Sequence, residues 1–178
     1  MHLRAVICVL AVSLGGCVTI PSIDRSADAA ALARQLGIPE SGVTFVAKCQ
    51  FVRAPKGIAY GPTAVGSCLF AKDALHIRVI DATTGKSEPY GTFSHDEIQS
   101  ISLYEGFPLT QLQVRLSGEI VAMVMRPDGG IGFNAADAKA LYEAMFAAGY
   151  ISVPSSRYIE LGNGGGGTAY VPIITPKK

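Results

Sequence analysis

The sequence feature that most restricts the fold is a series of short segments, between residues 43 and 126, in which apolar and polar residues alternate. Alternation with a period of two is the pattern of a β-strand that has one face in a core and the other in solvent. We predict strands at residues 43–53, 67–72, 75–81, 90–94, 98–104, 110–116 and 119–126. Most connections between them are short and typical of hairpins, so the strands are expected to pair antiparallel.

The same alternation indicates which side chains face the core. In the first segment, one face carries five residues: Val43, Phe45, Ala47, Cys49 and Phe51. Two later segments are expected to point five more residues inward: Ile101, Leu103, Leu112, Val114 and Leu116. Ser117 and Gly118 separate the last two segments and predict a two-residue hairpin turn.

A short helix is predicted before the first strand. Residues 28–36 are rich in alanine, and Ser26 is the expected N-cap. Gly37 lies just beyond the end of this segment, and Pro39 prevents its continuation.

A second helix is predicted after the last strand, at residues 135–148. Asn134 with Asp137 three residues later is a capping signal, and Gly149 ends the segment. Its apolar stripe consists of Ala138, Leu141, Tyr142, Met145 and Phe146. This stripe is wide enough to cover a sheet.

Seven strands of antiparallel character followed by one amphipathic helix is the element order of pleckstrin-homology-like domains. The stretch FSHDEIQSISLYEG at residues 93–106, followed by TQLQVRLS at residues 110–117, resembles the middle of such a domain, including the GRAM type. The resemblance covers residues 43–149 and implies a mainly β fold, a seven-stranded antiparallel barrel or sandwich with a C-terminal capping helix. The superfold does not imply a particular ligand.

The N-terminal segment has the features of a targeting signal. Arg4 precedes an apolar run at residues 5–14, which is too short to span a bilayer as a helix. The residues at the end of this run resemble the lipobox of bacterial lipoproteins: Leu14, Gly15, Gly16 and Cys17.

The lipobox resemblance implies that residues 1–16 are removed as a signal peptide and that Cys17 becomes the lipidated first residue, with a diacylglycerol thioether and an acylated amine. Two or three acyl chains anchor a protein stably to a membrane without spanning it. Val18 stands where an inner-membrane retention signal has Asp, so the resemblance favours the outer membrane, facing the periplasm. Residues 17–27 are then a tether. The alternative is an ordinary signal peptide with Cys at its cleavage site.

The charge of the chain argues against one class of function. The sequence has 15 basic and 14 acidic side chains, no Trp and no basic run. Removing residues 1–16 takes away Arg4 and leaves 14 side chains of each sign. Such a chain lacks the electrostatic signature of a nucleic-acid-binding protein, so no nucleic acid partner is expected.

Two cysteines remain for the folded domain, because Cys8 leaves with the signal peptide and Cys17 carries lipid. We predict that Cys49 and Cys68 form a disulfide, which the oxidising periplasm favours. The alternative is that one of them is a catalytic nucleophile. That role requires a nearby base, and residues 17–178 contain only two histidines.

Three short motifs suggest cofactor or metal chemistry but have simpler interpretations. Residues 130–135 fit the G-x-G-x-x-A pattern of dinucleotide sites, yet no βαβ unit accompanies them. Residues 85–87 match only the end of a phosphate-binding loop and indicate a turn. Residues 95–97, His-Asp-Glu, would need further ligands to hold a metal. We therefore expect neither a cofactor nor a metal.

The loop at residues 105–109 is the candidate contact with a partner. Gly106 and Pro108 mark a turn, where polar residues are usual, yet Phe107 and Leu109 are apolar. One interpretation is that both apolar side chains close the open end of the barrel. The other is that they protrude beside Tyr104 and form an amphipathic contact surface.

Residues 150–178 form a tail that differs in composition from the rest of the chain. A glycine-rich stretch at residues 162–167 predicts a hinge, and Pro172 and Pro176 favour an extended final piece. Two interpretations remain open for this tail. It adds a strand to its own sheet or to that of a partner, or it docks loosely.

The expected function is that of a non-catalytic envelope lipoprotein, held at the membrane by its lipid anchor, whose domain presents loops and the tail to another protein or envelope component. This expectation depends on the lack of a complete catalytic or cofactor motif in the sequence. The alternative is a small envelope hydrolase with a site near His95 or His76, where an imidazole would meet a Ser, a Cys or a carboxylate.

Overall fold

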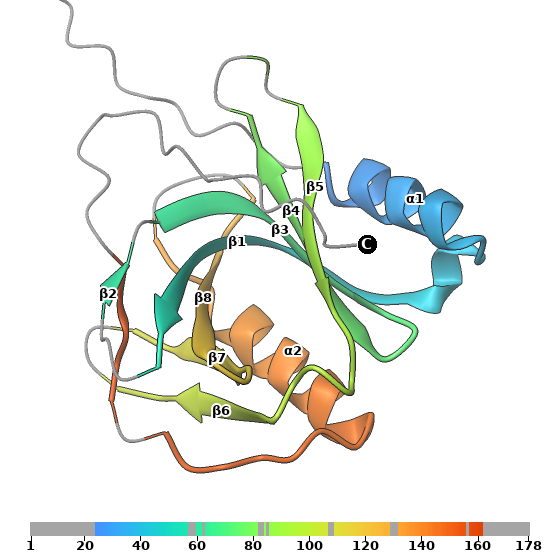
Figure 1. The fold of residues 1–178 in the computed structure, drawn as a ribbon. Helices are drawn as coiled ribbons and strands as arrows, with labels where there is room; N and C mark the ends of the chain where they lie inside the picture. The colour runs from blue at the N-terminus through green and yellow to red at the C-terminus, as the bar shows by residue number, and fades with distance from the viewer. Residues whose placement is uncertain are drawn as a thin grey trace, which may run out of the picture.

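The computed structural model describes residues 24–56, 60–61, 63–81, 84, 86–106, 109–128, 132–155 and 157–161 (Figure 1). The predicted signal peptide and Cys17 lie outside these residues, as do Phe107 and residues 162–178 of the tail. In the described part of the chain, no helix is both long enough and apolar enough to cross a membrane.

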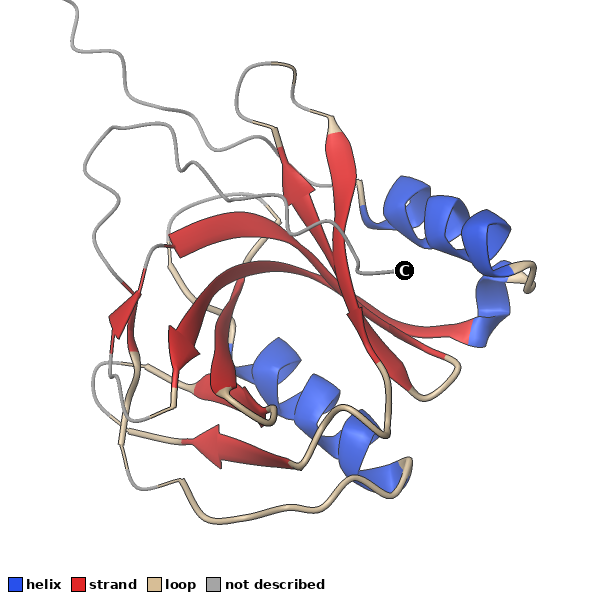
Figure 2. Cartoon of the chain, in the orientation of Figure 1, coloured by secondary structure: helices blue, strands red, loops and turns tan. Residues whose placement is uncertain are grey.

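The fold is built on one antiparallel sheet of seven strands, in the order β5-β4-β3-β1-β8-β7-β6. The strands are β1 (Val43–Pro55), β3 (Thr63–Ala71), β4 (Ala74–Ile80), β5 (Ser87–Phe93), β6 (Ser100–Tyr104), β7 (Gln111–Arg115) and β8 (Glu119–Arg126). The sheet curls, but β5 and β6 remain its two edges and do not pair, so it is not closed into a barrel (Figure 2). The predicted mainly β fold with a C-terminal helix is confirmed, in an open form.

Helix α2 (Ala135–Ala147) covers the inner face of this curled sheet (Figure 1). The Asn134 side chain accepts a hydrogen bond from the Asp137 N–H at 3.1 Å, as the sequence predicts. The buried residues Ala138, Leu141 and Met145 pack into the main core, together with inward side chains of β1, β6 and β8. Burial of this apolar stripe is the main reason for the helix to lie on the sheet.

The prediction that Phe146 belongs to the buried stripe is wrong, because its side chain is 58% exposed. Successive helical residues are rotated by about 100° around the helix axis, so Ala138 and Met145 lie almost on one line along the helix. Phe146 is rotated farther from that line than any other residue of the stripe. Tyr142 is half-buried at the edge of the stripe, and its ring stacks on that of Phe146 with centroids 6.3 Å apart.

Cys49 of β1 and Cys68 of β3 form a disulfide, which confirms the predicted pairing. In the register of these strands Cys49 faces Gly66 and Cys68 faces Ala47, and the α-carbons of the two cysteines are 5.8 Å apart. Both cysteines are buried in the main core. The disulfide therefore joins two central strands from inside the curled sheet.

The alternation predicted for β1 holds from Phe45 to Phe51 but fails at Val43. The pairing of β1 with β3 shifts its register between Val43 and Phe45. A one-residue shift turns a side chain to the opposite face of a sheet. Val43 accordingly packs on the outer face, in a small apolar cluster with Leu32 and Leu69.

Helix α1 (Arg25–Leu36) lies over that small cluster, on the outer face of β1 and β3. It begins three residues before the predicted start, because its N-cap is Asp24 rather than Ser26. The Asp24 side chain accepts hydrogen bonds from the N–H groups of Ser26 and Ala27, each at 3.0 Å. The last residues of the predicted tether are therefore helical. Gly37 ends the helix in the left-handed conformation, as predicted, with φ at 64°.

The turn between β3 and β4 is formed by Lys72 and Asp73, one residue earlier than the predicted pair of Asp73 and Ala74. Both turn residues have positive φ, 48° and 53°, which is the conformation of the tight hairpin turns that suit twisted strands. Ala74 instead pairs with Ala71 at the start of β4.

The described end of the chain, residues 150–161, forms what we call the C-terminal strap. The Ile101 N–H donates to the Ile151 carbonyl at 2.8 Å, and the Val153 N–H donates to the Ile101 carbonyl at 2.9 Å. The tail thus extends its own sheet by one parallel bridge, next to β6. This bridge occupies the edge of β6 that a closed barrel would offer to β5.

Three short elements complete the described fold: the 3-10 helix η1 (Glu40–Gly42), β2 (Tyr60–Gly61) and β9 (Glu160–Leu161). The two short strands pair with each other in parallel, at the end of the strap (Figure 1).

Candidate functional site

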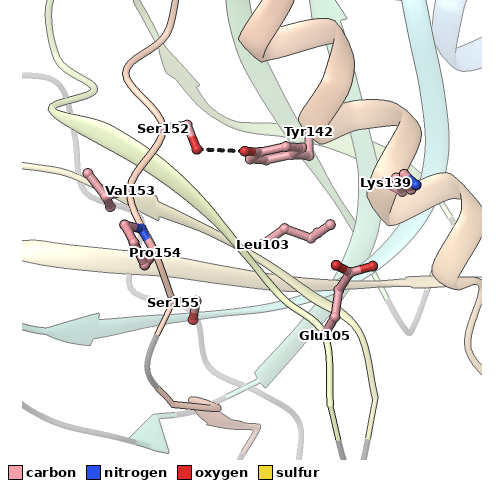
Figure 3. Close-up of a pocket in the computed structure, with 8 residues that line it drawn as sticks. All are labelled: Leu103, Glu105, Lys139, Tyr142, Ser152, Val153, Pro154 and Ser155. Carbon is pink, nitrogen blue, oxygen red and sulfur yellow. Dashed lines mark hydrogen bonds between the residues drawn. The ribbon is translucent and has the colours of Figure 1, made fainter.

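A groove opens between α2, the edge strand β6 and the C-terminal strap (Figure 3). It is open to solvent and has a volume of about 350 Å³. Eight residues line it: Leu103, Glu105, Lys139, Tyr142, Ser152, Val153, Pro154 and Ser155. These residues come from three parts of the sequence, so only the folded chain assembles the groove.

One wall of the groove is fixed by a contact between α2 and the strap. The Tyr142 hydroxyl and the Ser152 hydroxyl are 2.6 Å apart and form a hydrogen bond (Figure 3). Leu103 packs against the main core from β6, while Val153 and Pro154 lie on the side of the strap. The groove therefore has apolar surfaces on two sides and a hydroxyl pair at one end.

Two charged side chains, Lys139 and Glu105, border the groove away from that hydroxyl pair (Figure 3). The Lys139 Nζ also lies 3.9 Å from Oε1 of Glu143, on the next turn of α2, and both of these side chains are more than half exposed. Exposed pairs of this kind are weak, so Lys139 is free to turn toward a ligand. The rim of the groove thus offers one positive and one negative group.

The edge of β6 beside the groove has unused pairing capacity. The N–H and the C=O of Ile101 both form hydrogen bonds with the strap, on the side of β6 away from β7. Residues two positions apart on a strand direct their N–H and C=O groups to the same side. The N–H and C=O of Leu103 therefore point to the same edge. In the described residues the strap bonds to β6 last at Val153, and Pro154, which has no N–H, follows.

The strap is held in place by two glutamines of β7. The Gln111 amide donates to the Ile159 carbonyl at 2.9 Å and accepts from the Ile159 N–H at 3.0 Å. The Gln113 amide donates to the Arg157 carbonyl at 2.8 Å. Ile159 itself packs on apolar residues of the outer face: Val52, Ala54, Ile120 and Ala122. Because the strap is fixed at both ends, the residues that line the groove have a defined position beside β6.

Two of the predicted contact residues, Tyr104 and Leu109, are not among the residues that line this groove. Tyr104 is on the opposite face of β6 from Leu103, and its ring packs against Tyr158 of the strap with centroids 5.8 Å apart. Leu109 is half-buried, and Phe107 lies outside the described residues. The two interpretations of the loop at residues 105–109 therefore stay predictions.

His76 lies on β4 and is buried, with 4% of its surface exposed. Its Nδ1 is 2.9 Å from the Thr92 hydroxyl, and its Nε2 is 3.3 Å from the Ala71 carbonyl. A carbonyl can only accept, so Nε2 carries the proton and Nδ1 accepts from Thr92. Burial lowers the pKa of His76, which keeps the ring neutral. In this arrangement His76 orients Thr92 on the edge strand β5.

His95 lies in a polar turn, as the sequence indicates. Its ring packs on that of Tyr150, with centroids 4.6 Å apart. In the same turn, the Glu97 carboxylate accepts hydrogen bonds from the N–H and the hydroxyl of Ser94, which lower the pKa of Glu97. Within the residues that the structure describes, no group of three or more His, Cys, Asp or Glu side chains is placed to hold a metal ion.

The groove was not predicted from the sequence, because half of its lining belongs to the tail. Ser152, Val153 and Pro154 follow α2 without any alternation that would indicate a return to β6.

Comparison of the chain with protein-family models and with curated proteins finds no match.

Proposed function

We propose that this protein is a lipid-anchored, periplasm-facing lipoprotein of the outer membrane that binds an extended segment of a partner protein, without catalysis, in the groove between α2, β6 and the C-terminal strap. The observation that carries this proposal is the backbone edge at Leu103, which has no strand partner among the described residues and lies directly beside apolar side chains of the same groove. Extended peptides bind such edges by adding a strand, which is a recurring mode of peptide recognition.

The lining of the groove suits an extended peptide in which apolar and polar side chains alternate. A peptide strand next to Leu103 would exchange backbone hydrogen bonds with β6 and place every second side chain toward α2 or the strap. An apolar side chain there would contact Val153 and Pro154. Lys139 and Glu105 on the rim would favour a partner with an acidic and a basic residue in matching order.

The anchor is proposed from the sequence alone. Residues 1–17, with their apolar run and the motif that ends at Cys17, support lipidation, and Val18 supports the outer membrane as the destination. The order of the seven strands and the closing helix supports a relationship to pleckstrin-homology-like domains, although that superfold serves many ligands.

Site-specific photo-crosslinking tests the proposed binding site. A photoreactive amino acid replaces Ser155, in the groove, or Glu88, an exposed residue of β5, in the full-length protein in living cells. We expect crosslinks from position 155 that mass spectrometry maps to one extended segment with alternating apolar residues. Products that are the same from both positions would contradict a specific site.

A pair of substitutions at Leu103 tests the role of the backbone edge. Leu103→Pro removes the outward N–H, and proline is tolerated on an edge strand where that group faces away from the sheet. Leu103→Val keeps the N–H and an apolar side chain. We expect the crosslink to be lost in the proline variant and kept in the valine variant, with melting temperatures confirming that both fold. Persistence of the crosslink in the proline variant would reject strand addition at this edge.

A further inference from the structure

Exposed apolar side chains gather around α2. Three large hydrophobic side chains are exposed within the described ranges: Phe133 at 46%, Phe146 at 58% and Ile151 at 67%. Phe133 directly precedes the N-cap of α2, Phe146 lies in its last turn, and Ile151 lies just beyond its end. Single exposed apolar residues are common on soluble proteins, but a group that follows one helix is a recognised sign of a contact surface.

The outward face of α2 itself carries little charge. Its exposed positions are Ala135, Ala136, Lys139, Ala140, Glu143, Phe146 and Ala147. Its two charged side chains, Lys139 and Glu143, are of opposite sign, so these exposed positions carry no net charge. A helix that faces water normally presents a charged and polar face, so this outward face is unusually apolar for its position.

The chain enters the domain next to this helix. The Arg25 guanidinium, at the start of α1, binds Asp137 in the first turn of α2 at 2.7 Å and Asp128, just after β8, at 2.7 Å. Phe146 lies nine residues beyond Asp137, which is about 14 Å along a helix. The tether therefore ends beside the helix that carries the exposed apolar residues.

The length of the tether allows this helix to reach the membrane. Cys17 and Asp24 are seven residues apart, and seven extended residues span at most about 25 Å. An anchored Cys17 therefore confines the domain near the lipid surface, with the tether entering beside the first turn of α2. Such confinement gives a high effective concentration, which favours even a weak contact with the surface.

We infer that the outward face of α2, with Phe146 and Ile151, rests on the surface of the membrane that holds the lipid anchor. This inference rests on the proposed lipidation of Cys17. Phe146 and Ile151 enter the boundary between headgroups and acyl chains, and the Tyr142 ring stacked on Phe146 supports the contact. Lys139 places its methylene groups along this surface with its ammonium group in water. Because the face is neutral, the contact does not depend on anionic lipid.

Tryptophan fluorescence measures this contact directly, because the chain contains no Trp. The full-length lipidated protein with Phe146→Trp is reconstituted into phosphatidylcholine vesicles whose acyl chains carry bromine, which quenches a nearby indole. We expect emission to fall to about half of its value in unbrominated vesicles, with no change when anionic lipid is added. The exposed position of Phe146 accommodates the larger ring, and an unchanged melting temperature verifies the fold.

The matched control is Glu88→Trp, an exposed position at the start of β5, the edge strand at the other side of the sheet from β6. Its emission is expected to stay unquenched. Equal quenching at both positions would contradict the proposed contact of α2 with the membrane. No quenching at position 146, in protein that floats with the vesicles, would contradict it as well. Neither result would contradict the lipid anchor. Protein that does not float with vesicles would reject the anchor itself, and the inference with it.

A protein partner is the competing occupant of this face. If the indole of Phe146→Trp shifts to shorter wavelength only when envelope proteins are added, and bromine does not quench it, the face binds protein and the membrane contact is wrong.

Discussion

Asp28 is buried at the interface between α1 and the sheet, where an unpaired carboxylate would be costly. The Ser67 hydroxyl of β3 donates a hydrogen bond to it, and the Arg78 guanidinium of β4 lies 3.8 Å away. Arg78 is held in turn by the hydroxyl and the carbonyl of Ser87, at 2.9 and 2.7 Å. At the scale of single residues, these polar contacts fix the position of α1 on strands that are distant in sequence.

His76 predicts a pH dependence of stability. Burial lowers its pKa in the folded protein from the ordinary value of 6.5, against the smaller opposing effect of the Ala71 carbonyl. Between the lowered pKa and 6.5, the unfolded chain binds a proton that the folded chain does not. The contribution of His76 to the free energy of unfolding is thus complete above pH 6.5 and falls as the pH decreases below it.

Urea unfolding at pH 7.5 and at pH 5, in the wild type and in His76→Gln, measures this contribution. The amide replaces the neutral imidazole without titrating, so the variant should lose less stability than the wild type on acidification. Equal losses in the two proteins would show that His76 does not contribute to the pH dependence.

At the scale of elements, the C-terminal strap depends on side chains rather than on a strand ladder. Gln111→Ala leaves the N–H and the carbonyl of Ile159 buried without partners. Each unsatisfied group costs about 1–3 kcal/mol, so we expect a loss of about 2–6 kcal/mol in the free energy of unfolding for the two groups. Trypsin should also cleave after Arg157 faster, because the strap detaches more often.

Ser155→Ala is the matched control for the strap. Its hydroxyl makes only long contacts, at 3.3 and 3.4 Å, so its removal should change stability and cleavage at Arg157 little. Similar cleavage rates in Gln111→Ala and the wild type would mean that Gln111 does not hold the strap.

The sequence allowed most strands and both helices to be predicted, because alternation and caps are local signals. The hairpin at Ser117 and Gly118 is confirmed, and β8 has the predicted bounds. The strap could not be predicted, since the glutamine contacts that hold it join residues more than forty positions apart in the chain. The groove depends on the strap and could not be predicted either. Gln111 and Gln113 alternate with apolar residues as on a solvent-facing strand, yet both are buried beneath the strap.

At the scale of the whole molecule, the proposed lipidation of Cys17 predicts where the domain acts. Cys17→Ala removes the acceptor sulfur, so we expect an unprocessed precursor or a product without acyl chains. Metabolic labelling with a fatty acid, followed by purification of the protein, measures the modification. Cys8→Ala, within the predicted signal peptide, should be labelled like the wild type. Label that persists in Cys17→Ala would contradict lipidation at this residue.

The open sheet has a consequence if the proposed anchor confines the protein to a membrane surface. Copies concentrated in one plane meet often, and a free strand edge is a template on which they could polymerise. The edge strand β5 limits this risk, because Pro89 lacks an N–H, Glu88 is charged, and the pairing with β4 shifts register beside them. On β6 the strap already occupies the edge at Ile101. These features keep crowded copies from joining edge to edge, and within the described residues the stretch at Leu103 is the part of β6 that stays open to another chain.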